Sequence, residues 1–179
     1  HNEKLRKELN AVKKEAKEAA KKIAIKIPHF KDCKYHYGHK KYGEDSTIFI
    51  TEGPSAAGSM VSARDVFTQA IFGLKGVPMN LHGKTRAAIY KNVEMFNLMS
   101  ALGIEDSVDN LRFNKVIIAT DADYDEFHIR ILLLTFFLSF FEELVQRGHV
   151  YILETPLFRV RNNKETRYCY TAKERDAAL

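Results

Sequence analysis

Two short apolar segments that end in acidic residues constrain the fold of this chain more than any other feature. Residues 48–52 run from isoleucine and phenylalanine into a glutamate, and residues 117–125 run from a β-branched stretch into three alternating aspartates. Short runs of this kind are typical of buried strands. In open α/β folds, ligands bind at the edge where such strands end. We therefore expect four carboxylates to converge at one sheet edge, those of Glu52, Asp121, Asp123 and Asp125.

Carboxylates gathered at one place repel each other unless a cation lies among them. Oxygen ligands without His or Cys favour Mg²⁺. Asp121 and Asp123 point the same way on an extended backbone, because side chains alternate with a period of two. We interpret the pattern as a magnesium site for phosphate chemistry. A solvated acidic turn before a helix is the alternative, since Asp suits helix N-termini. The matching position of Glu52 on another strand favours the metal.

The composition is compatible with many functions. The 179 residues, 45% of them hydrophobic, suffice for one ordinary domain with an appended arm, and the formal charge of +5 fits a polyanionic partner without requiring one. Cys33 and Cys169 belong to no CxxC pair, so we expect reduced thiols. The most apolar run, residues 129–141, is too short for a membrane span and contains Arg130, so it reads as a core helix.

The N-terminal region is interpreted as an arm and a connector. Residues 4–26 form an amphipathic pattern that predicts a charged helix ending before Pro28. Its lysines suit a phosphate backbone, but a solvated helix face is the favoured interpretation. In the irregular connector that follows, His36 and His39 have the spacing of a metal pair, but no ligand cluster accompanies them, so we expect no zinc site. The missing initial Met and the helix-like end suggest a piece of a longer polypeptide.

Strands and helices then alternate, which predicts an α/β fold with a parallel sheet flanked by helices. Residues 53–59 are mostly small. Small side chains either allow an anion to approach the backbone or allow a helix to pack closely on the sheet. We expect a turn at Asn162-Asn163. The expected helices span about 59–69, 84–100 and 128–146, and the expected strands span 48–52, 70–74, 116–120, 151–153, 158–160 and 168–170.

Several motifs occur in an order that resembles the Toprim domain of the B subunits of bacterial type IIA DNA topoisomerases, the topoisomerase IV and gyrase family. The resemblance covers roughly residues 46–170. It implies a Rossmann-like Toprim domain with a C-terminal β tail over residues 46–179, and an N-terminal helical arm over 1–45 that resembles the end of a transducer segment. The motifs are Glu52-Gly53-x-Ser55-Ala56-x-Gly58-Ser59, Asp121-x-Asp123-x-Asp125, His128-Ile129-Arg130, Leu132-Leu133-Leu134-Thr135-Phe136-Phe137, Gly148-His149-Val150-Tyr151-Ile152 and Thr155-Pro156-Leu157-Phe158-Arg159-Val160.

The resemblance also implies a mechanism. Glu52 matches the catalytic, metal-binding Glu of the family, and Asp121 and Asp123 match its metal ligands, with Asp125 as a further candidate. They would hold one or two Mg²⁺ beside a phosphate of double-stranded DNA, which a tyrosine of the partner A subunit attacks during ATP-dependent strand passage. ATP would bind to the parent protein outside these residues. The expected location is cytoplasmic, at the bacterial nucleoid. The expected DNA contacts are Lys75, Arg64 and His128.

Three positions depart from the family pattern. Pro54 stands where the family usually has Asp, Val77 where it usually has a basic residue, and Glu126 where it has Gly, so that Glu126 is expected to strain a turn. These departures leave open a divergent Toprim scaffold that binds DNA and the A subunit with weak or no cleavage. A Toprim primase or nuclease is a third possibility, against which the match over 129–160 argues. The fragment alone is expected to be inactive, because the nucleophile lies elsewhere.

Overall fold

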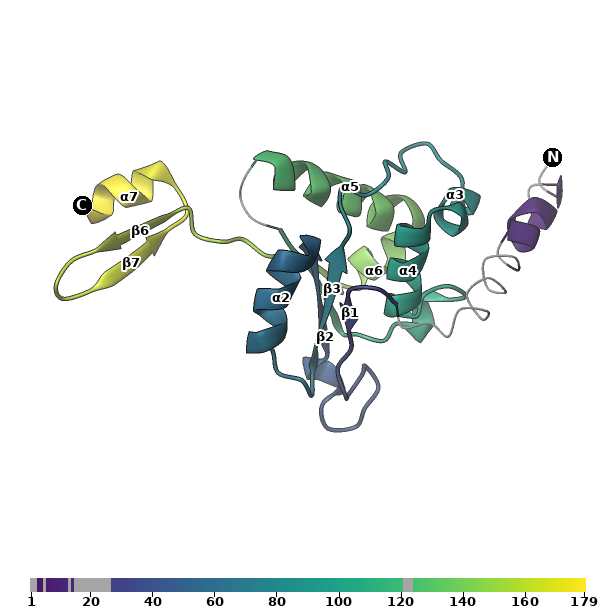
Figure 1. The fold of residues 1–179 in the computed structure, drawn as a ribbon, viewed down its shortest axis with the longest axis horizontal. Helices are drawn as coiled ribbons and strands as arrows, with labels where there is room; N and C mark the ends of the chain where they lie inside the picture. The colour runs from purple at the N-terminus through teal and green to yellow at the C-terminus, as the bar shows by residue number, and fades with distance from the viewer. Residues whose placement is uncertain (1–2, 5, 13, 15–26, 121–123) are drawn as a thin grey trace.

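A computed structural model describes residues 3–4, 6–12, 14, 27–120 and 124–179 (Figure 1). Its centre is a five-stranded sheet in the order β1-β3-β2-β4-β5. The short β1 pairs antiparallel with β3, and the other three pairings are parallel. This confirms the predicted parallel sheet. The strands are β1 (Phe30–Lys31), β2 (Thr47–Glu52), β3 (Gln69–Leu74), β4 (Lys115–Ala119) and β5 (Val150–Ile152).

Helices cover both faces of the sheet. Ile48 and Ile50 of β2 are fully buried in the main core, together with Leu98 of α4 and Phe137 of α5. The helix α2 lies against β3 on the other face, where Ala57 approaches Gly73. The helices are α2 (Gly53–Ala63), α3 (Arg86–Lys91), α4 (Val93–Leu102), α5 (Tyr124–Phe140) and α6 (Glu142–Gln146), with short 3₁₀ turns η1 (Gly43–Asp45) and η2 (Val108–Asn110).

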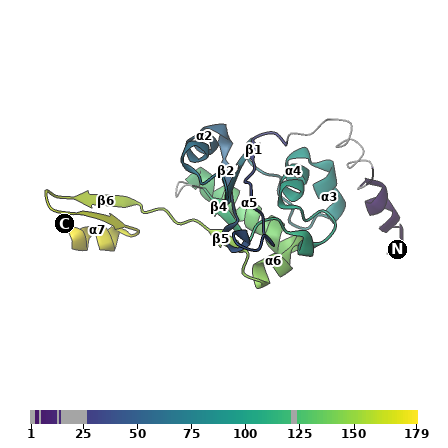
Figure 2. The same cartoon turned by 90° about the horizontal axis from the view of Figure 1, so that it is seen from below.

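A C-terminal module projects from the sheet. It consists of the antiparallel strands β6 (Phe158–Arg161) and β7 (Thr166–Cys169) and the helix α7 (Ala172–Ala178). Figures 1 and 2 show it extending away from the end of the sheet at which α5 begins. The predicted turn is confirmed, because Asn162 both donates its N–H to the carbonyl of Glu165 and accepts two backbone N–H groups with its side chain.

Three predicted helices have different bounds. The helix expected from residue 59 begins at Gly53, because Gly53 takes a positive φ of 69° that turns the strand directly into a helix. The helix expected over 84–100 breaks at Asn92, whose side chain accepts the N–H of Met95 and caps α4. The third breaks at the buried Phe141, which separates α5 from α6.

At the N-terminus, residues 3–4, 6–12 and 14 are helical, and Leu9 and Val12 pack against the core. The remainder of the predicted helix, residues 15–26, lies outside the described residues. Cys33 and Cys169 are buried free thiols, as predicted. Within the described ranges, every helix is too short or too polar to cross a membrane.

The close contact between α2 and β3 can be tested through its contribution to stability. A Cβ at Gly73 would lie 2.9 Å from the Cβ of Ala57. Gly73→Ala should therefore push α2 outward and lower the free energy of unfolding by about 1–3 kcal/mol in urea denaturation. The matched change Gly58→Ala, in α2 with nothing within 4 Å of the new Cβ, should raise it by about 0.4–1 kcal/mol. Equal effects of the two changes would contradict this packing.

Candidate functional site

The predicted site lies at the carboxyl edge of three adjacent parallel strands. The central strand is β2, in which Glu52 pairs with Leu74 of β3 and Thr51 pairs with Ala119 of β4. Parallel strands in this register end together, so Glu52 lies between the chain that leaves β3 and the chain that leaves β4. The edge combines the end of β2 with the end of β4, about 70 residues further along the chain.

Glu52 is held there by a strand that changes abruptly into a helix. Its backbone is extended, with φ −78° and ψ 125°, and α2 begins at the next residue. The carboxylate does not cap α2. It is half-buried, and within the described residues it makes no hydrogen bond or ion pair. A half-buried carboxylate that nothing compensates is suited to bind a cation.

The small residues after Glu52 have a packing role. An added Cβ on Gly73 would meet both the Cβ of Ala57 and, at 3.4 Å, the carbonyl oxygen of Gly53. The backbone of α2 therefore approaches β3 closely, which only small side chains permit. Of the two sequence interpretations of residues 53–59, the geometry supports close packing.

The second half of the predicted site is only partly described. Asp121 and Asp123 lie outside the described residues, so their role stays a prediction. Asp125 lies in the first turn of α5. Thr120, which follows β4, is buried.

Arg130 holds the end of β4 in place. Its Nε lies 3.4 Å from Oγ1 of Thr120, and its Nη2 donates to the carbonyl oxygen of Thr120 over 3.3 Å. Sequence reasoning missed this role, although Arg130 belongs to one of the motifs. The signal in the sequence was its position as the one charged residue of the apolar run 129–141, since a cation in such a run needs a polar partner.

The three predicted DNA contacts do not lie together. Lys75 is exposed immediately after β3, at the same sheet edge as Glu52. Its backbone N–H donates to the carboxylate of Glu94 over 3.0 Å. His128 is exposed on the second turn of α5.

Arg64 lies at the opposite end of β3 from Lys75, roughly 16 Å away along the strand. Its guanidinium donates to the carbonyls of Gln69, Val61 and Asp32.

A second group of potential metal ligands lies near that opposite end. Single donor atoms of Asp32, Cys33 and His36 fall within 4.8 Å of one another. The guanidinium of Arg112 lies among these donor atoms, where a metal ion would have to bind. Its Nη2 is in contact with the carboxylate of Asp32 and 2.8 Å from Nε2 of His36. Burial, reinforced by the charge of Asp32, raises the pKa of the Cys33 thiol to about 11. A guanidinium and a protonated thiol do not fit a dication, so we interpret the cluster as structural.

The cluster ties the connector to the core. Burial of Asp32 opposes its ionisation, but hydrogen bonds from His36 and Arg112 outweigh burial and hold the pKa of the carboxyl below its ordinary value of 3.8. Arg112 also donates to the carbonyl of Ala101 at the end of α4. Its guanidinium lies over the ring of Phe113 at 5.5 Å.

Comparison with known proteins gives consistent matches. The model of the Toprim domain family matches residues 47–155. The chain is 63% identical over 179 residues to the B subunit of DNA topoisomerase 4 from Borreliella burgdorferi, covering 99% of this chain and 30% of that protein. It is 48% identical over 132 residues to the B subunit of DNA gyrase from Mycoplasmoides gallisepticum, covering 72% and 20%. The chain thus spans less than a third of these relatives.

A solved structure supports the fold. The crystal structure of the Plasmodium falciparum topoisomerase II DNA-binding, cleavage and re-ligation domain superposes with a TM-score of 0.73 at 26% identity. The match covers 86% of this chain and 22% of that chain.

The Asp32 cluster predicts a defined pH dependence of stability. Because the folded-state pKa of Asp32 is depressed, its contribution is complete above the unfolded pKa of 3.8 and is lost as the pH falls through the lower folded value. Asp32→Asn should lower the free energy of unfolding at pH 7 by about 1 kcal/mol, since the side chain is 38% exposed and screened. In urea denaturation the difference from the parent should shrink below pH 3.8.

The control for this prediction is Asp109→Asn, which removes an exposed pair with Arg147 at 2.9 Å. We expect this change to alter stability by less than about 0.5 kcal/mol. A deficit of Asp32→Asn that persists at pH 2 would contradict the electrostatic account.

Proposed function

This chain belongs to the Toprim family, in the branch found in the B subunits of topoisomerase IV and gyrase, and we propose that it forms the metal-binding half of a DNA-cleavage centre. The observation that carries the proposal is Glu52, whose carboxylate lies at the edge between β3 and β4 and has no hydrogen bond or ion pair among the residues that the structure describes. The proposed reaction is cleavage and religation of double-stranded DNA, coupled in the parent protein to ATP-dependent strand passage.

The side chains at this edge fit Mg²⁺. Glu52 would hold the ion together with Asp121 and Asp123, with Asp125 as a further ligand for a second ion. All four supply oxygen atoms, the donors that Mg²⁺ prefers. When bound, Mg²⁺ stabilises the negative charge that develops on phosphate oxygens during transfer. The buried Thr120, held by Arg130, fixes the point from which Asp121 and Asp123 follow.

The residues of this chain would bind and orient the phosphate, and Glu52 would also accept or return a proton. Lys75 supplies a positive charge beside Glu52, and His128 adds a second polar contact from α5. The tyrosine nucleophile belongs to the A-type partner in this proposal. The proposed location is the bacterial cytoplasm, at the nucleoid.

The departures from the family pattern are compatible with the fold. Pro54 stands in the first turn of α2, where its missing N–H is not needed. Glu126 lies within α5, so the strain expected from a turn is not found, and an acid in a first helical turn is electrostatically favourable. Val77 is 64% exposed beyond Lys75, so one expected charge is replaced by an apolar surface. This observation keeps the weakly cleaving scaffold as the second proposal.

A cleavage assay separates these proposals. In the full-length protein reconstituted with its A-type partner, Glu52→Gln should reduce Mg²⁺-dependent DNA cleavage at least about 100-fold. Glu142→Gln, at an exposed glutamate that accepts from Gln146, should leave cleavage unchanged. Titration of Mg²⁺ against the parent and against Asp121→Ala and Asp123→Ala should show weakened binding in both variants. Parent-like cleavage by Glu52→Gln would overturn the proposed role, and an inactive parent would favour the scaffold.

The geometry separates the two basic residues that the sequence grouped together. Lys75→Gln should weaken duplex binding and reduce the slope of log K against log salt by about 0.9, the value for one phosphate contact. Arg64→Gln should leave the slope unchanged but lower the free energy of unfolding by about 1–3 kcal/mol, because three carbonyls lose a donor. Fluorescence anisotropy and urea denaturation measure both properties. A salt slope lowered by Arg64→Gln would place DNA at the opposite end of the sheet.

A further inference from the structure

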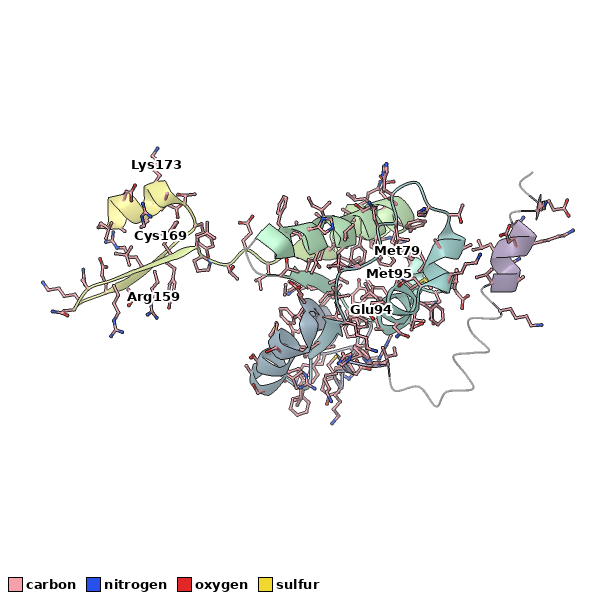
Figure 3. The ribbon with its side chains drawn as sticks, turned by 45° about the horizontal axis from the view of Figure 1, so that its top comes forward. Met79, Glu94, Met95, Arg159, Cys169 and Lys173 are labelled. Carbon is pink, nitrogen blue, oxygen red and sulfur yellow. The ribbon has the colours of Figure 1, made fainter. Side chains whose placement is uncertain are left out.

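The two faces of the C-terminal ribbon β6–β7 differ sharply. Arg159 pairs with Tyr168, and Arg161 pairs with Thr166. Because residues directly opposite one another share a face, these four side chains form one surface, which we call the outer face. Figure 3 shows Arg159 on the side of the ribbon away from α7, with Cys169 between the ribbon and the helix.

The acidic side chains of the module belong to the other side. Glu165 pairs with Arg167 at 2.9 Å, and Asp176 pairs with Arg175 at 2.7 Å. The carboxylate of Glu174 accepts the N–H of Tyr170 over 2.8 Å, while the backbone N–H of Glu174 donates to the hydroxyl of Thr171, which caps α7. Every carboxylate of the module thus has a partner within the module, and none lies on the outer face.

The arginines of the outer face have no such partners. Arg159 and Arg161 are exposed and make no hydrogen bond or ion pair in the described part of the chain. Tyr168 beside them is 61% exposed. Residues 158–178 contain six cationic and three acidic side chains, so the module carries three of the five net positive charges of the chain. Of the cations in the module that have no such partner, Arg159 and Arg161 share the outer face, whereas Lys173 lies on α7 on the opposite side (Figure 3).

The module begins beside the proposed cleavage edge. A cavity of about 320 Å³ lies between the start of α5, which supplies Phe127 and Arg130, and the segment entering and leaving the ribbon, which supplies Leu157 and Tyr170. Arg130 is also the residue that contacts Thr120 at the end of β4. The ribbon projects outward from this end of the domain (Figure 2).

We propose that the outer face binds the phosphate backbone of duplex DNA beyond the segment held at Glu52. Arg159 and Arg161 lie about 6.7 Å apart along the strand. That spacing is about twice the 3.4 Å axial rise per phosphate of one DNA strand. A two-stranded ribbon also fits the major groove, and arginine forks match phosphate geometry. This inference rests on the proposed function only for the identity of the ligand as DNA, and it requires neither Glu52 nor a metal.

The test uses the full-length protein with its A-type partner and a duplex long enough to extend past the cleavage edge, in EDTA. Arg159→Gln/Arg161→Gln should weaken duplex binding several-fold and reduce the slope of log K against log salt by about 1.8, for two phosphate contacts. Arg159→Lys/Arg161→Lys should keep most of the slope. Both variants change exposed side chains, so the melting temperature should match that of the parent.

The matched control is Arg167→Gln, an arginine of the same ribbon that faces α7 and pairs with Glu165. It should leave the salt slope unchanged. A parent-like slope in the double glutamine variant overturns the proposal. So does a loss of assembly with the A-type partner without a change in duplex binding, which would assign the face to an acidic protein surface.

The two proposals fail separately. If Glu52→Gln cleaves normally while Arg159→Gln/Arg161→Gln loses duplex affinity, the metal role is wrong and the ribbon contact stands. If the glutamine pair binds like the parent while Glu52→Gln is inactive, only the ribbon contact is wrong.

Discussion

The parallel register of β2 between β3 and β4 is the constraint on which the site depends. It aligns the ends of three strands, so that Glu52 at the end of β2 lies between Lys75 and Thr120. Gly53 then directs the chain into α2 without an intervening loop, which keeps Glu52 at the sheet edge. The tight approach of α2 to Gly73 holds this geometry in place. The position of one carboxylate therefore depends on backbone packing more than on contacts of its own.

The same sheet has opposite electrostatic arrangements at its two ends. At the amino end, Arg64, Arg112, Asp32 and His36 satisfy one another and nearby carbonyls, which stabilises the connector. At the carboxyl end, Glu52 has no partner within the described residues, and Arg130 is directed to a backbone carbonyl. Charges that are paired within the protein stabilise the fold, whereas a charge without such a partner is available to bind a ligand.

The sequence predicted the alternation of elements because strand and helix periods are local properties. It predicted the edge position of Glu52 because a carboxylate is costly to bury, so an acid that follows a buried apolar strand lies where that strand leaves the core. It did not predict that α2 begins at Gly53 or that Asn92 interrupts a helix, since both depend on the backbone conformation of one residue. It grouped Arg64 with Lys75 because charge alone does not reveal at which end of a strand a residue lies. That distinction requires the fold.

The acidic edge creates a problem for any DNA-binding function, because carboxylates repel phosphates. A bound cation resolves this repulsion only locally, within a few ångströms, since salt screens charges over about 8–10 Å. Attraction for the rest of the duplex must come from cations elsewhere on the surface. The outer face of β6–β7 is suited to this task, because its arginines are unpaired within the described residues and its carboxylates are segregated to the opposite side. A molecule that concentrates negative charge at the proposed cleavage edge gains from placing positive charge on a projecting ribbon, where it attracts the same polyanion without neutralising the proposed metal ligands.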